Sequence, residues 1–174
     1  GVPTLFGDWL TVKPDYVNQS SLEYQGIDWN VTKRIETENA GDFYFNVLSS
    51  HIISIYSRFD AQSDEIEYLS YYTYQPRSQQ NMSISWVYQD FSTTLFADRL
   101  GHMEWGSRGK SDPHIISNIT TRYNYSPDIN VYLSIRNLDD TMPQKDPGEG
   151  YPYYDQGYFS AFGRYYSVGF NYRF

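Results

Sequence analysis

The stretch GRYYSVGFNYRF, residues 163–174, places large apolar residues at every second position from Tyr166 to Phe174. A period of two is the pattern of a β-strand that has one apolar face. The alternation recurs in four other places and, less cleanly, over residues 42–58 and 90–104, so we expect seven strands and no helices. The four clean stretches are Ile27–Ile35, Met82–Tyr88, Ile115–Tyr125 and Ile129–Ile135.

The composition agrees with an all-β chain. Tyr (19), Phe (10) and Trp (4) together outnumber Leu, Ile and Val, and Ala occurs only four times among 174 residues, which excludes an all-α fold. With a net charge of −8, the chain lacks the basic surface that a nucleic-acid partner requires. The absence of cysteine excludes disulfides, thiol catalysis and cysteine-ligated zinc. A mean hydropathy of −0.64 argues against a helical membrane protein, but not against a membrane barrel.

The connections between the expected strands alternate in length. Short connections fall at residues 36–41, 88–90 and 126–128, and long ones at 60–79, 105–112 and 139–160. Tight turns at one end and long loops at the other are typical of a transmembrane β-barrel, with periplasmic turns and extracellular loops. The stretches also approach the nine to eleven residues of a membrane-crossing strand, and their apolar faces end in aromatics. Lys33 interrupts one such face beside a short turn, within reach of lipid headgroups.

The C-terminal stretch resembles the last strand of TonB-dependent outer-membrane receptors, in which a Gly-Arg pair precedes alternating apolar residues and a terminal aromatic. It is also similar to the signal that the barrel-assembly machinery reads. Three further elements resemble the same family: Asn137-Leu138-Asp139-Asp140 before Pro143 (with Asp139 where the family has an aromatic), Gln75-Pro76-Arg77 before Asn81 and Trp86, and Leu22–Trp29 with Gly26. The residues that carry the signal are Gly163, Arg164, Val168, Phe170, Tyr172 and Phe174.

This resemblance implies a transmembrane up-and-down barrel of 22 strands, of which residues 21–174 would be about the last seven, with residues 1–20 as an extracellular loop segment. It implies an outer-membrane transporter for a scarce large solute, such as a ferric siderophore, cobalamin or an oligosaccharide, with a periplasmic C-terminus. The partners would be the missing N-terminal plug and barrel strands, the TonB complex acting through that plug, the barrel-assembly machinery and membrane lipid. The chain would be a fragment, a remnant or one piece of a split barrel. It would have no catalytic residues, cofactor or metal.

Two loops carry the candidate ligand-binding residues. Aromatic rings could grip a sugar or an aryl group, and the alternative is that they pack the loop on itself. The histidines His51, His102 and His114 lack metal-ligand spacing. Polar residues of the lumen side, including Asp28, Asn30, Arg34, Arg122 and Arg136, are expected to form a wall against the plug. The candidate ligand-binding residues are Tyr151, Tyr153, Tyr154 and Phe159 in one loop and His102 and Trp105 in another.

Two other interpretations stay open at this point. A small stand-alone porin-like or adhesin-like barrel needs an even number of strands, and Leu5–Val12, with Gly7 and Asp8 inside it, is a poor eighth strand. A soluble β-sandwich that acts as a binding module would be monodisperse without detergent.

Overall fold

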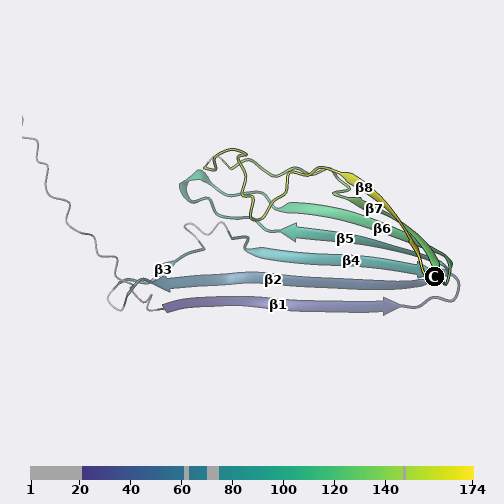
Figure 1. Cartoon of the computed structure of the whole chain (residues 1–174). Coiled ribbons are helices and arrows are strands. Elements are labelled where there is room, and N and C mark those ends of the chain that lie inside the picture. Colours follow the sequence, from purple (N-terminus) through teal and green to yellow (C-terminus); the bar gives the residue numbers. More distant parts are fainter. Residues whose placement is uncertain (1–20, 61–62, 70–74, 147) are drawn as a thin grey trace, which may run out of the picture.

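The computed structural model describes residues 21–60, 63–69, 75–146 and 148–174, which form one antiparallel sheet (Figure 1). Seven long strands follow each other across the sheet in chain order, and the two-residue β3 (Ile66–Glu67) pairs with β2 off this path. This confirms the expected all-β, up-and-down arrangement. The long strands are β1 (Ser21–Ile35), β2 (Asp42–Arg58), β4 (Ser78–Tyr88), β5 (Phe91–Leu100), β6 (His114–Ser126), β7 (Ile129–Arg136) and β8 (Tyr165–Tyr172).

Helical structure in the described residues is limited to a single 3-10 turn, η1 (Gly106–Arg108). Within this part of the chain, no helix is long and apolar enough to cross a membrane.

The connections gather by length at opposite ends of the sheet. Short turns join β1 to β2, β4 to β5 and β6 to β7 at the end where the C-terminus lies, which we call the turn end (Figure 1). At the β4–β5 turn, Gln89 takes a left-handed φ of 51°. The three long connections emerge at the opposite end, which we call the loop end. The predicted alternation of short and long connections is therefore confirmed.

Strand β5 ends four residues earlier than the sequence predicts. The amide of Gly101 donates to the carbonyl of Ser78 (2.7 Å), which closes the β4–β5 pairing. The chain then doubles back on itself, because the Met103 amide donates to the Ser111 hydroxyl (2.8 Å) and the Ser111 amide to the Met103 carbonyl (2.9 Å). Residues 101–113 therefore form a separate compact loop, in which Met103 and Trp105 are buried.

The register gives the sheet two chemically different faces, because residues directly opposite each other on paired strands point to the same side. The row Val31, Val47, Met82, Ala97 lies on one side, and the next row, Asn30, Leu48, Asn81, Asp98, lies on the other. We call these sides the apolar face and the polar face. The apolar face includes Trp29, Phe45, Ile84, Leu95, Ile119, Tyr123, Val131, Leu133, Ile135, Val168 and Phe170.

Hydrogen bonds between side chains cross the polar face from strand to strand. Thr32 donates to Asn46 (3.0 Å), Asn81 to Asp98 (2.6 Å) and Asn171 to Asn130 (2.9 Å). The expected wall residues Asp28, Asn30, Arg34, Arg122 and Arg136 all lie on this face.

The turns are staggered across the sheet. A single row of partners runs from Ile35 through Trp86 and Leu133 to Val168. The β1–β2 pairing ends on this row, the β4–β5 pairing two residues beyond it, and the β6–β7 pairing four or five residues beyond it. From each strand to the next, the turn therefore moves along by about one residue (3.3 Å), and neighbouring strands lie about 4.8 Å apart. The strands are thus tilted by about 35–40° from the direction perpendicular to the line that joins the turns.

The sheet is open in the part of the chain that the structure describes. Strands β1 and β8 each pair with one neighbour only. The buried apolar residues lie near the loop end: Ile52, Ile55 and Leu69 cluster where β1 and β2 extend past the other strands. In this extension β2 carries one extra residue opposite Gln25 and Gly26, which is a β-bulge.

Candidate ligand-binding site

The loop of residues 137–164 is tied at both ends to the loop end of the sheet. The Asn137 amide group donates to the carbonyls of Thr141 (2.8 Å) and Phe162 (3.3 Å), and its oxygen accepts from the Thr141 amide (2.8 Å). The backbone amide of Arg164 donates to the Asp140 carboxylate (2.7 Å). These bonds bring the outgoing and returning segments of the loop together where β7 ends and β8 begins.

The same loop is also held against the loop of residues 101–113. The Arg108 guanidinium lies 3.6 Å from the carboxylate of Asp146, a residue that is only 3% exposed. Gly148 lies so close to this guanidinium that a Cβ there would overlap it. The Asp112 amide adds a hydrogen bond to the Gln144 side chain (2.7 Å).

A cavity of about 540 Å³ lies between this loop and the polar face. One ring wall is held by an edge-on contact between His114 and Phe159, with centroids 4.9 Å apart. Elsewhere in the lining, the Arg136 guanidinium lies 5.6 Å from the centre of the Tyr165 ring. The lining residues are Asp98, Leu100, His114, Ile116, Asn118, Arg136, Asn137, Tyr158, Phe159, Ser160, Phe162 and Tyr165.

The cavity combines aromatic surface with a few fixed polar groups. The Asp98 carboxylate is held by Asn81 (2.6 Å) and supplies an acceptor, while Arg136 supplies donors. Partial burial and the nearby Asp155 raise the pKa of Tyr158, so its hydroxyl stays protonated near neutral pH. Rings that stack, together with donors and acceptors at the margins, suit a sugar or an aryl group that carries hydroxyls.

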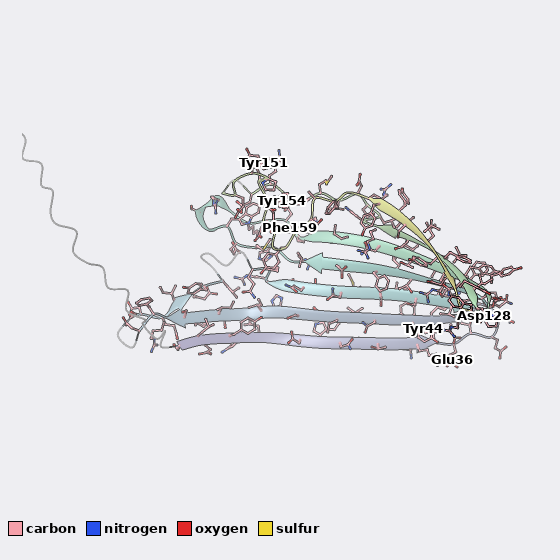
Figure 2. All side chains as sticks on the ribbon, in the orientation of Figure 1. Glu36, Tyr44, Asp128, Tyr151, Tyr154 and Phe159 are labelled. Carbon is pink, nitrogen blue, oxygen red and sulfur yellow. The ribbon has the colours of Figure 1, made fainter. Side chains whose placement is uncertain are left out.

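Three of the six candidate ligand-binding residues lie around this loop and its cavities. Phe159 lines the main cavity and also a smaller one of about 170 Å³, which it shares with the buried Trp105. Tyr154 and Phe159 together line a shallow third hollow, and Figure 2 shows both below Tyr151 on the loop. These three residues therefore combine loop packing with contact to the cavities.

The other three candidate residues line none of these three cavities. Tyr151 is 88% exposed and meets Tyr153 edge-on at 6.0 Å, so this pair projects into solvent. His102 lies 3.6 Å from Glu104 in the other loop. Burial lowers the pKa of His102 against the opposing effect of Glu104, so the imidazole is neutral near pH 7 and the contact is not a charge pair there.

Several cavity residues escape sequence reasoning. His114 carries no motif, and Tyr158, Phe162 and Tyr165 are three aromatics among many. The sequence signal for this site is the position of its polar residues. Asp98, Asn118 and Arg136 are polar-face residues near the loop ends of adjacent strands. In the described part of the chain, no three histidine or carboxylate side chains converge as a metal site would require.

The residues of the expected assembly signal occupy one edge of the sheet. Val168, Phe170 and Tyr172 lie on the apolar face of β8, opposite Leu133, Val131 and Ile129. The other three flank the strand: Gly163 is packed so close to Asp140 that a Cβ would collide with the carboxylate, Arg164 bonds to it, and Phe174 is fully exposed.

Comparisons with protein-family models, with curated proteins and with solved structures found no match for this chain.

Proposed function

We propose that this chain is part of the wall of a transmembrane β-barrel in the outer membrane of a Gram-negative bacterium, and that the barrel is a TonB-dependent transporter. The observation that carries the proposal is the sheet's one-sided apolar band, which has aromatic rings along the turn end and consists of tilted strands. A tilt of about 35–40° lies within the range for membrane barrels.

The aromatic rings follow the stagger of the turns. Phe91 and Tyr123 stack with centroids 4.5 Å apart, and Trp86 and Tyr88 with centroids 6.0 Å apart, all on the apolar face near the turns. The Trp86 indole donates to the Ala40 carbonyl in the first turn (2.7 Å). Above this rim the face is mostly apolar, with aliphatic side chains alongside Trp29 and Phe45 and with the hydrogen-bonded pair Thr93 and Thr121. A mostly apolar face above an aromatic rim matches a lipid-facing band with an interfacial girdle. The rim consists of Phe43, Trp86, Tyr88, Phe91, Tyr123, Tyr172 and Phe174.

The open edges require additional strands in this proposal. Backbone groups along β1 and β8 that face no neighbour would be costly in hydrocarbon, where no water can pair with them. The resemblance to TonB-dependent receptors implies further strands that complete the wall and a plug against which the polar face would lie. The chain would bind and hold a solute but would not catalyse a reaction.

The main cavity then opens on the luminal side, at the extracellular end of the wall. Its rings and polar groups would help to capture the solute before transport driven by the TonB complex. The choice among a ferric siderophore, cobalamin and an oligosaccharide rests on the resemblance, and the aryl-hydroxyl and sugar chemistries suit the lining best.

Two neighbouring residues on opposite faces provide the first test. Leu95 lies in the aliphatic band of the apolar face, whereas Phe96 lies on the polar face. In a lipid-facing wall Leu95→Arg would cost about 2–4 kcal/mol, whereas Phe96→Arg would be tolerated. We expect that only Leu95→Arg abolishes the folded, heat-stable protein that detergent extracts from the membrane. Equal behaviour of the two variants, or a chain that is monodisperse without detergent, would favour a soluble sandwich.

Two measurements test the transporter assignment itself. The polypeptide that carries this chain, taken from the outer-membrane fraction, should have a mass far above 20 kDa, because 22 strands need roughly 550 residues at about 25 per strand. Solute uptake through it should cease in cells that lack TonB. A membrane species near 20 kDa, or uptake that is independent of TonB, would favour a stand-alone barrel.

A further inference from the structure

The apolar face carries a cluster of polar side chains at its loop end. Arg99 donates from Nη1 to the Gln80 side-chain oxygen (2.6 Å) and to the Ser78 hydroxyl (3.2 Å). Gln80 in turn donates to the hydroxyl of Ser49 (3.2 Å). Three strands therefore contribute to a cluster that fixes one guanidinium on an otherwise apolar surface.

The guanidinium of Arg99 has capacity for a further ligand. Of its five N–H donors, only those of Nη1 have acceptors in the described part of the chain. No carboxylate of these residues forms an ion pair with it. Its sequence neighbour Asp98 points to the opposite face, where Asn81 holds it. The cluster thus presents a positive charge and unused donors on the apolar side.

The position of Arg99 indicates what would meet these donors, on the basis of the function proposed above. Arg99 lies eight residues along β5 from Phe91 in the aromatic rim. With about 3.3 Å per residue and strands tilted by about 35–40°, this places Arg99 about 20 Å above the rim. A lipid-facing band is about 25 Å tall, so the backbone of Arg99 lies about 5 Å inside the outer boundary of the band, a distance that its long side chain can span to the headgroups of the outer leaflet.

We propose that Arg99, positioned by Gln80 and Ser78, binds the phosphate of a phosphorylated lipid headgroup in the outer leaflet. A guanidinium fork matches two phosphate oxygens and forms short, charge-assisted hydrogen bonds with them. Phosphate also complements the uncompensated positive charge, and the acyl chains of the same lipid would cover the aliphatic residues below, Ala97 and Leu95.

The test uses the detergent-extracted polypeptide that carries this chain, with dimyristoyl phosphatidic acid as the probe and native mass spectrometry as the readout. We expect Arg99→Gln to weaken retention of the probe about five- to tenfold, and Arg99→Lys, which loses the fork, to weaken it less. The matched control is Lys33→Gln, which removes the cation at the turn end of the same face and should leave retention of the probe unchanged.

Specific outcomes would overturn the site. One is an equal loss of probe in Arg99→Gln and Lys33→Gln, which would indicate attraction by net charge alone. Another is competition by inorganic phosphate at the probe's concentration, which would indicate an anion site and not a lipid site. A protein that passes the Leu95 and Phe96 test but shows no such selectivity disproves this inference alone, whereas failure of that test removes the membrane wall itself.

Discussion

Arg108 and Asp146 form an ion pair between two long loops, which the hydrogen bond from Asp112 to Gln144 also joins. Their side chains lie 3.6 Å apart, and the Asp146 carboxylate is almost completely buried while the guanidinium remains about one-third exposed. One oxygen of Asp146 accepts from the Gly148 amide (2.7 Å), and the other is buried with no hydrogen-bond partner among the described residues. Because a buried carboxylate is costly without its cation, we expect this contact to hold the loop of residues 137–164 against the loop of residues 101–113.

We expect Asp146→Asn to loosen the loop of residues 137–164. Removing the charge deletes the ion pair, and the partial exposure of Arg108 reduces the loss to about 1–2 kcal/mol, which is about tenfold in the population of the open loop. Limited proteolysis should detect this as a faster cut within the loop. Asp139→Asn, at an exposed carboxylate of the same loop, is the matched control. Equal cleavage of both variants would mean that the ion pair does not hold the loop.

Phe159→Ala should weaken binding in the main cavity. The substitution removes a wall of the cavity and its edge contact with His114, so we expect at least fivefold weaker binding of a ring-containing ligand. Isothermal titration with 2,3-dihydroxybenzoate and with maltotriose covers the aryl and sugar chemistries. Tyr151→Ala, which removes a ring that projects into solvent, should bind as the unaltered protein does. A larger effect for Tyr151 would move the site to the tip of the loop.

Acid should loosen the loop of residues 101–113 through His102. Burial lowers the pKa of this imidazole, so the folded loop takes up a proton less readily than the unfolded chain does. Its contribution to stability is therefore complete above about pH 6.5 and declines as the pH falls from there towards the lowered pKa. Hydrogen exchange of the loop amides at pH 7.5 and 5, corrected for intrinsic rates, should reveal the change. His102→Gln should abolish the pH difference; a difference that persists would point to another group.

Gly169→Val should destabilise the β7–β8 pairing. The ring of Tyr132 lies directly over Gly169 on the polar face, so any Cβ at this position would collide with the ring. Displacing the ring loses its packing, and we expect a cost of about 1–3 kcal/mol, seen as a lower unfolding temperature in detergent. In a double-mutant cycle, Tyr132→Ala should remove most of this penalty. Additive effects of the two substitutions would show that the ring does not depend on the glycine.

Much of the sheet could be predicted from the sequence, because alternation is a local signal. The pattern from Tyr166 to Phe174, together with the turn at Pro127, determined strands, faces and the end at which the chain turns. The length of β5 could not be predicted from its own residues. Its end depends on a hydrogen bond from Gly101 to Ser78, which lies at the start of the preceding strand, β4.

The cavity was less predictable for a similar reason. The loop that covers it is shaped by single polar contacts of Asn137, Asp140 and Asp146, and none of these has a periodicity. Aromatic composition indicates residues 148–159 as a whole, but only the folded loop distinguishes Phe159, which faces the cavity, from Tyr151, which faces solvent.

The stepped register also disfavours wrong strand pairings when the sheet forms. Pairing that slips by one residue would turn every side chain of the slipped strand over, exposing residues such as Asn118 and Arg122 among Leu95 and Val131. A slip of two residues preserves the faces but displaces the aromatic rim by about 7 Å. A slip by an odd number of residues thus mixes the polar and apolar faces, and a slip by an even number breaks the line of aromatic rings. Only one pairing keeps both the faces and the rim intact.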